Sequence, residues 1–297
     1  MTSEWPVHER GASHTVRGMD PTEARHRAEI FKKLHEGPEV LVLPNPWDRG
    51  TARMFENLGF KGLASTSAGL AFSLGRRDGD GAVTADETFA HIEELLMATR
   101  VPMSADLENG FGDSPEAVAK TILRAGAVGL SGASIEDATY RDDAPLYERS
   151  LATERIHAAV EAARSLPHPF VLTARAENFI RGRPDLDDTL ARLTAYEAAG
   201  ADVLYAPGLP TDDALRLVCR TIKKPFNYVA GVGGPTRFTL AELQAIGVRR
   251  VTIGTSLVRC ALASALSAAR EILEHGSFRY TDGIPSVARF NDLIAPE

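Results

Sequence analysis

Acidic residues stand where three short apolar segments end, at a spacing that would bring them to one place. The segment SADLENG carries Asp106 and Glu108, SIEDAT carries Glu136, and TARAENF carries Arg175 followed by Glu177. Because residues two apart in a strand project to the same side, Asp106 and Glu108 would share a face. Several carboxylates at one site repel each other unless a cation lies among them. The pattern therefore indicates a cation site.

The expected ligands at this site are oxygen atoms, since no histidine or cysteine stands at these segment ends. Oxygen ligands suit Mg²⁺, with Mn²⁺ as the alternative, and do not suit zinc. We therefore predict that Asp106, Glu108 and Glu136 bind the metal. Each acid taken singly could instead form a salt bridge or cap a helix, but that alternative is weaker for the three together.

A small anionic substrate is the partner that the neighbouring residues predict. The guanidinium of Arg175, beside a metal, could bind a substrate carboxylate through two hydrogen bonds. Its alternative role is an ion pair with Glu177 or Glu136. The run STSAG at 65–69 offers backbone N–H groups ahead of a helix, where an anionic oxygen could bind. The predicted substrate-binding residues are Ser65, Thr66, Ser67, Ala68, Arg175 and Asn227.

The segments that carry these residues alternate with amphipathic helical patterns. Strands are expected at 40–45, 62–66, 102–108, 128–137, 170–177, 203–208, 225–230 and 250–255. Helices are expected at 21–36, 48–58, 84–100, 114–126, 152–164, 186–200, 211–222, 239–247 and 256–276. Eight apolar strands, each followed by a helix, favour an α/β fold with a parallel sheet. We predict a closed (β/α)₈ TIM-type barrel, which carries its chemistry at the carboxyl ends of its strands. An open doubly wound sheet is the alternative, although no G-x-G-x-x-G follows the first strand.

Composition and charge exclude several function classes. The net charge of −7 over 297 residues argues against a nucleic-acid partner and against an anionic membrane surface. No apolar run reaches membrane-spanning length, and the first residues are unlike a signal peptide, so we expect a cytoplasmic location. We expect residues 1–36 to form an N-terminal arm and lead-in helix, 37–276 the barrel, and 277–297 a tail. Cys219 and Cys260 lie in apolar helical patterns and are expected to be buried small hydrophobic residues.

The last long helical pattern, SLVRCALASALSAAREILEHG, is apolar on more than one face. Its larger apolar residues are Leu257, Leu262, Leu266, Ile272 and Leu273, and they stand among many alanines. This is too apolar for a helix with one buried stripe and a solvated back. We therefore expect the helix to pack against a second subunit in a homo-oligomer, a dimer or a tetramer. The alternative is that residues 277–297 fold back and cover it.

Five segments occur in order and with compatible spacing: GFKGLASTSAGLAFSLGRRDG, SADLENGFGDSPEAVAKTI, SIEDAT, VLTARAENFI and GADVLYAPGL. Together they resemble the isocitrate lyase/phosphoenolpyruvate mutase superfamily over about residues 40–275. The resemblance implies an eight-stranded barrel, usually a homotetramer whose last helix is exchanged between neighbours. It also implies Mg²⁺-dependent chemistry through an enolate of pyruvate or a close relative.

The resemblance also implies roles for single residues. Asp106 matches the family's direct metal ligand, and Glu108 and Glu136 match carboxylates that hold metal-bound waters. Thr66, Ser67 and Ala68 match the loop that binds the substrate carboxylate, and Arg175 matches the arginine that grips the substrate. Asp78, in LGRRD, matches an aspartate near the site. The residues expected to be catalytic are therefore Arg175, Glu136 and Asp78.

Two departures from the family pattern narrow the expected activity. Isocitrate and methylisocitrate lyases carry a Lys-x-Cys-Gly-His loop after the fourth-strand Glu-Asp, where this chain reads ATYRDDAPLYERSLATERI. True isocitrate lyase activity is therefore not expected, and the lack of a Lys-x-Asn-Ser loop weakens the mutase interpretation. The segment 129–136 is also about three residues longer than the usual family spacing, which leaves the exact role of Glu136 open.

The sequence thus predicts a Mg²⁺-dependent lyase or decarboxylase that breaks a carbon–carbon bond next to a 2-oxo or 2-hydroxy carboxylate. Tyr205 or a metal-bound water would donate the proton to the enolate, and a loop at 110–116 or 138–150 would close over the site. One alternative is C–P bond chemistry, as in a phosphonopyruvate hydrolase or a phosphoenolpyruvate mutase, with Arg76, Arg77 and Arg141 as extra cations. Another, from a different class, is a non-catalytic barrel that binds a metabolite.

Overall fold

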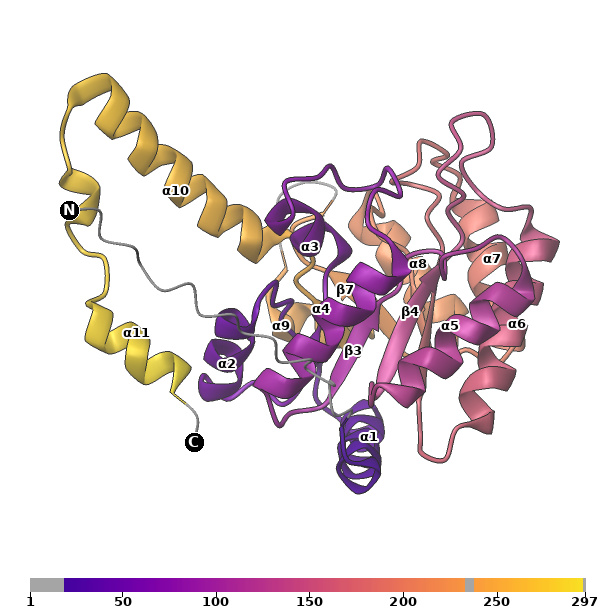
Figure 1. Ribbon diagram of the computed structural model, residues 1–297. Helices are drawn as coiled ribbons and strands as arrows, with labels where there is room; N and C mark the ends of the chain where they lie inside the picture. Colours follow the sequence, from indigo (N-terminus) through magenta and orange to yellow (C-terminus); the bar gives the residue numbers. More distant parts are fainter. Residues whose placement is uncertain (1–18, 233–237, 296–297) are drawn as a thin grey trace, which may run out of the picture.

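Eight parallel strands form a nearly closed barrel in the computed structural model, which describes residues 19–232 and 238–295 (Figure 1). The strands are β1 (Leu41–Leu43), β2 (Leu63–Ala64), β3 (Met103–Asp106), β4 (Gly132–Glu136), β5 (Val171–Arg175), β6 (Val203–Tyr205), β7 (Phe226–Val229) and β8 (Arg250–Thr252). Their order in the sheet is β1-β8-β7-β6-β5-β4-β3-β2. At the remaining seam, the backbone N–H of Ala64 donates to the carbonyl of Pro44 at 3.1 Å. The predicted TIM-type barrel is confirmed.

Helices pack around the outside of the strands (Figure 1). They are α1 (Pro21–Glu36), α2 (Arg49–Asn57), α3 (Ser67–Ser73), α4 (Ala85–Ala98), α5 (Pro115–Ala127), α6 (Arg149–Ser165), α7 (Leu186–Ala198), α8 (Asp212–Thr221), α9 (Leu240–Ile246), α10 (Ser256–His275), the short η1 (Arg279–Thr281) and α11 (Val287–Ile294). The side chain of Asp20 caps α1 by accepting from the N–H groups of Thr22 and Glu23. Helix α1 lies across one end of the barrel, where Phe31 packs with Leu43 and Val171.

The helix α3 was not predicted as a separate element. It follows β2 directly and starts at Thr66, whose hydroxyl accepts from the N–H of Gly69 at 3.2 Å. Seven residues give too few turns for an apolar period to stand out. The consequence for the site is that residues 65–68 form the junction between a strand end and a helix start.

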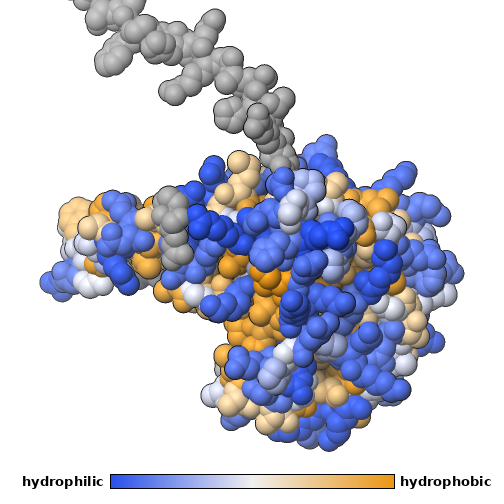
Figure 2. Space-filling view, turned by 90° about the horizontal axis from the view of Figure 1, so that it is seen from below, coloured by the Kyte–Doolittle hydropathy of each residue, from blue (hydrophilic) through white to orange (hydrophobic). Residues whose placement is uncertain are grey.

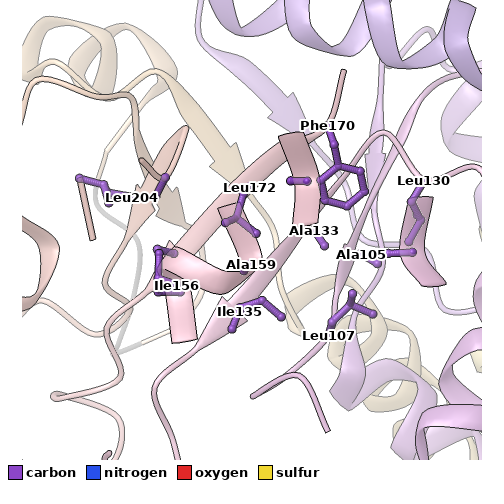
Figure 3. Close-up of a cluster of buried hydrophobic side chains, with 14 of the residues drawn as sticks. Ala105, Leu107, Leu130, Ala133, Ile135, Ile156, Ala159, Phe170, Leu172 and Leu204 are labelled. Atoms are coloured by element: carbon purple, nitrogen blue, oxygen red, sulfur yellow. The ribbon is translucent and has the colours of Figure 1, made fainter. Parts of the chain in front are cut away.

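Alternation along the strands divides the hydrophobic core from the polar barrel interior. Ala133 and Ile135 of β4 and Leu172 of β5 are fully buried among side chains of the covering helices, such as Ile156 (Figure 3). Burial of a leucine or isoleucine side chain contributes about 1.5–3 kcal/mol each. The intervening residues, Ser134 and Glu136 on β4 and Thr173 and Arg175 on β5, line a cavity inside the barrel. The same strands therefore build the core on one side and the site on the other.

The chain ends in an arm, residues 256–295, that stands away from the barrel (Figure 1). Of the twenty residues of α10 only Val258 is buried, and the side chains of Leu262, Leu266 and Leu273 are 50%, 52% and 85% exposed. Figure 2 shows apolar surface on this arm and in the angle where it meets the barrel. Helix α11 packs beside α2, where Asn57 donates to the carbonyl of Leu293 at 2.9 Å.

The arm corrects one expectation about the cysteines. Cys260 is exposed on α10 and is not a buried hydrophobic residue, because that helix has no barrel surface to pack against. Cys219 on α8 is partly buried, and burial raises its pKa to about 11. Among the described residues, no helix combines the length and apolarity needed to cross a membrane.

Candidate active site

A polar cavity of about 730 Å³ opens at the carboxyl ends of the barrel strands. Its lining includes every residue that the sequence predicted for the site: Ser65, Thr66, Ser67, Ala68, Asp78, Asp106, Glu108, Glu136, Arg175 and Asn227. Most of these residues come from strand ends and the residues that follow them, Ser67 and Ala68 start α3, and Asn227 lies within β7. Asp78 comes from the loop between α3 and α4. The barrel therefore brings together residues that lie up to about 160 positions apart in the sequence.

Three carboxylates meet on one wall of this cavity. Asp106 ends β3 and accepts from the hydroxyl of Ser67 at 2.9 Å. Glu108 follows it with its backbone in the left-handed region (φ 50°), which is strained for a residue with a side chain. Burial, together with Asp106 and Glu136, raises the pKa of Glu108 to about 8. Both the burial and the neighbouring carboxylates disfavour the charged form of Glu108.

Arg175 lies among these acids. Its guanidinium is 3.1 Å from Glu136 and 3.8 Å from Asp106, and it also contacts Glu177. Glu177 is completely buried. In the structure, Arg175 therefore makes the ion pairs considered as its alternative role, while its 14% exposed side chain still lines the cavity.

Asp78 lies close enough to Asp106 and Glu136 for their negative charges to affect its pKa. Burial, and then Asp106 and Glu136, raise the pKa of Asp78. Asp137, the residue after Glu136, points elsewhere: it pairs with Arg192 at 3.1 Å and accepts from the backbone N–H of Glu177. Of the Glu-Asp pair that ends β4, only Glu136 lines the cavity.

The donor set fits a magnesium ion held mainly through water. Among the described residues, no three His, Cys, Asp or Glu side chains are already gathered as a coordination sphere. Glu136 is instead held by Arg175 and by Arg181, each at 3.1 Å. In the described part of the chain Glu108 has no cationic partner, and Asp106 has only Arg175, at 3.8 Å. Mg²⁺ characteristically takes one or two carboxylates and keeps several waters. The residues present therefore fit a magnesium ion with Asp106 as direct ligand, as the resemblance implies, and with Glu108 and Glu136 reaching bound waters.

Three lining residues were not singled out from the sequence. The hydroxyl of Tyr140 donates to Glu136 at 3.0 Å and to Glu108 at 3.2 Å. Arg181 pairs with Glu136 and, at 3.3 Å, with Glu177. Arg250 lies deep in the cavity on β8. Its place in the expected strand 250–255, two residues before Thr252 on the same face, was a signal that could have been used, whereas Tyr140 and Arg181 stand in loops without a regular pattern.

The cations expected for C–P chemistry are engaged elsewhere, and none of them lines the cavity. Arg76 pairs with Glu87 at 2.7 Å, Arg77 with Asp80 at 3.4 Å, and Arg141 with Asp113 at 3.1 Å. Each of these arginines pairs with a carboxylate outside the cavity, so the expectation that they add positive charge to the site was wrong. The cysteines Cys219 and Cys260 do not line the cavity either.

Comparison with known proteins gives a consistent result. A family model described as phosphoenolpyruvate phosphomutase matches residues 31–273. A probable 2-methylisocitrate lyase 1 of Corynebacterium glutamicum is 27% identical over 280 residues, which are 91% of this chain and 90% of that protein. The solved structure of a putative lyase/mutase from Burkholderia cenocepacia is 49% identical, with a TM-score of 0.89 over 93% of this chain and 98% of that chain. A solved oxaloacetate acetylhydrolase in complex with the product oxalate is 26% identical, with a TM-score of 0.80 over 90% and 93% of the two chains.

Proposed function

The chain belongs to the phosphoenolpyruvate mutase/isocitrate lyase superfamily, and from that premise we propose that it is a Mg²⁺-dependent carbon–carbon lyase or decarboxylase. Its substrate would be a small 2-oxo or 2-hydroxy carboxylic acid. The observation that carries the proposal is the meeting of Asp106, Glu108 and Glu136 with Arg175 in one polar cavity. The names of the relatives support the same class, since oxaloacetate is a 2-oxo acid and methylisocitrate a hydroxy acid.

The residues of the cavity would bind and orient the acid. Backbone N–H groups at the start of α3 and the guanidinium of Arg175 can hold the carboxylate next to the reacting carbon. A divalent ion bound at Asp106 would stabilise the negative charge that develops on the 2-oxygen. In a 2-oxo acid, the electron pair of the breaking carbon–carbon bond stays on the pyruvate-type fragment as an enolate, and the other carbon leaves as carbon dioxide or as another carbonyl compound. In a 2-hydroxy acid, the 2-hydroxyl loses its proton and becomes the carbonyl of the 2-oxo product, and the electron pair goes to the other fragment as a carbanion. A proton delivered to the carbon that lost its substituent then completes the product.

Proton delivery falls to a hydroxyl group rather than to a thiol, since neither cysteine lines the cavity. Tyr140 contacts two of the carboxylates through its hydroxyl, whereas the ring of Tyr205 lies 5.0 Å from the guanidinium of Arg175. The contact between Tyr140 and the acids favours this residue as the group that holds the transferable proton.

The proposal can be tested with Asp106→Asn, which keeps the shape of the side chain and removes its charge. We expect calorimetry to show loss of Mg²⁺ binding, and an assay coupled to pyruvate release to show a fall in kcat/KM of at least about 100-fold. The matched control is Asp86→Asn. The carboxylate of Asp86 is 89% exposed and pairs with Arg124 outside the cavity. If Asp106→Asn bound Mg²⁺ as tightly as the wild type, the metal assignment would be wrong.

The same assay separates the alternative functions. Oxaloacetate, substituted malates and phosphonopyruvate serve as test substrates, with metal-free enzyme as the blank. Turnover of phosphonopyruvate alone would indicate C–P chemistry. Tight Mg²⁺ and oxalate binding without turnover of any of them would favour a non-catalytic, metabolite-binding barrel.

A further inference from the structure

A buried arginine lies at the bottom of the cavity without a carboxylate partner among the described residues. Arg250 is 3% exposed and points into the barrel from β8. Its guanidinium donates to the hydroxyl of Thr173 at 2.9 Å and, more weakly, to that of Ser104 at 3.5 Å. Its Nε is buried and has no hydrogen-bond partner.

Three other arginines in this part of the barrel, by contrast, have carboxylate partners. Arg175 and Arg181 each contact two glutamates, and Arg192 contacts two aspartates. Burial of an unpaired charge costs several kcal/mol even after the surroundings relax. In agreement with this cost, burial lowers the pKa of Arg250 to about 10. A partner that carries negative charge would offset the cost.

The surroundings of Arg250 are built from small polar side chains. Ser104, Ser134, Thr173, Asn227 and Thr252 line this part of the cavity. The hydroxyl of Thr173 accepts from Arg250, so its own proton is free to be donated. This depth of the barrel therefore offers hydrogen-bond donors around a positive charge, which is the environment that binds a carboxylate.

The distance from the metal-binding wall suits one molecule that reaches both places. Ser104 stands two residues before Asp106 on β3, and Thr173 stands two residues before Arg175 on β5. At about 3.3 Å per residue, the two levels are roughly 7 Å apart along the strands. A four-carbon dicarboxylic acid whose first carboxylate lies beside Asp106 could place its second carboxylate at Arg250.

We propose that Arg250, with Thr173 and Ser104, forms an anion subsite that takes the distal carboxylate of a dicarboxylic substrate. The inference rests on the proposed function, because the near end of the substrate is placed by the metal-binding wall. It narrows the substrate class from 2-oxo or 2-hydroxy acids in general to those with a second carboxylate. Arg250 is a specificity-determining residue in this scheme, since it touches the end of the substrate that lies away from the metal.

The test compares two ligands by calorimetry in the presence of Mg²⁺ and in chloride-free buffer. Oxalate has no carboxylate beyond the two that can chelate a cation, whereas 3,3-difluorooxaloacetate has a distal one. In Arg250→Met we expect affinity for 3,3-difluorooxaloacetate to fall about 10- to 100-fold, the loss typical of a charged hydrogen bond. Affinity for oxalate should change by less than about 3-fold.

Three further variants keep the test decisive. Arg249→Met removes the neighbouring exposed arginine, which donates to the carbonyl of Pro38 at 3.1 Å, and should leave both affinities unchanged. If Arg250→Met fails to fold, Thr173→Val removes a single hydroxyl from the subsite and should weaken binding of 3,3-difluorooxaloacetate only. Arg250→Lys keeps the charge and should retain part of the preference for the dicarboxylate.

The outcomes are distinct for the subsite and for the function. If wild-type protein binds oxalate with Mg²⁺ but the Arg250 and Thr173 variants weaken both ligands equally, or neither, the subsite proposal fails and the proposed function stands. If wild-type protein does not bind oxalate at all, the proposed function fails first. If added chloride raises the melting temperature of the wild type but not of Arg250→Met, and the preference for the dicarboxylate survives the substitution, an inorganic ion is the partner and the carboxylate assignment is overturned.

Discussion

Tyr140 joins two carboxylates of the cavity through one hydroxyl group. Burial and the charges of Glu136 and Glu108 raise its pKa, so the phenol keeps its proton. A proton held at this position can be passed to a carbanion that forms in the cavity, a contribution worth about 100-fold or more in rate. We therefore expect Tyr140→Phe to lower kcat by about 100-fold with little change in KM.

Tyr205→Phe is the matched control, because Tyr205 lines the same cavity and is also buried. Steady-state kinetics on both variants would distinguish the two phenols, and thermal unfolding would check that each variant is folded. A loss of kcat confined to Tyr205→Phe would assign proton delivery to Tyr205 instead.

At the scale of residues, the sequence identified most of the groups at strand ends, whereas it missed Tyr140, which a loop positions. Asp106, Glu136 and Arg175 end apolar strands, so the barrel rule places them at the mouth. Tyr140 stands in a loop with a left-handed backbone (φ 59°), a conformation that hydrophobic periodicity does not encode. The ion pairs of Arg175 with Glu136 and Glu177 depend on side-chain packing and were open until the structure placed them.

Among the elements, α10 leaves large apolar side chains uncovered: Leu262, Leu266, Ile272 and Leu273 are 38–85% exposed. The possibility that residues 277–297 fold back over it is not what the structure shows for residues 277–295, because α11 packs beside α2 instead. We propose that the arm packs against a second copy of the chain, because exposed leucines along a twenty-residue helix mark an interaction surface. Leu266→Glu should therefore shift the protein from an oligomer toward a monomer in light scattering.

The control for that substitution is Leu58→Glu. Leu58 is 59% exposed at the end of α2, outside the arm, and its replacement should leave the mass unchanged. Circular dichroism of both variants would show whether the barrel stays folded. A wild-type protein that scatters as a 32.0 kDa monomer at micromolar concentration would refute the proposal.

The strands and most helices could be predicted because their local signals agree. Ser114 and Thr211, for example, cap α5 and α8 with their side chains, and Gly247 ends α9 in the left-handed conformation. Helix α3 could not be predicted in this way, since its seven residues are too few for an amphipathic period to stand out. Helix α11 lies in a segment that the sequence indicated only as a tail.

For the whole molecule, His35 predicts a loss of stability in acid. Its Nδ1 lies 2.8 Å from the carbonyl of Phe31, and its Nε2 is buried without a partner. Burial, and then Arg250, lower the pKa of His35 from 6.5 to about 4. The folded protein thus keeps this histidine neutral while the unfolded chain takes up a proton below pH 6.5. The free energy of unfolding therefore decreases as the pH falls from about 6.5 to 4, and at pH 5 the decrease is about 2 kcal/mol.

Urea unfolding at pH 7.5 and at pH 5 would measure this effect. We expect His35→Gln to remove about 2 kcal/mol of the difference between the two pH values. His157→Gln is the control, because the side chain of His157 is 60% exposed and belongs to another helix, α6. An identical acid sensitivity in the wild type and His35→Gln would contradict the assignment to His35.

The arm begins in the wall of the cavity. Gly254 and Thr255 line the cavity, α10 starts at the next residue, and Arg259 in its first turn lines the cavity as well. A helix that meets a second subunit would therefore share its first residues with the surface that meets the substrate. Thermodynamic linkage is reciprocal. If subunit association increases the affinity for substrate, substrate binding increases the affinity between subunits by the same factor. Substrate binding and subunit assembly would then depend on each other. Because a higher protein concentration favours assembly, turnover per subunit would rise with protein concentration.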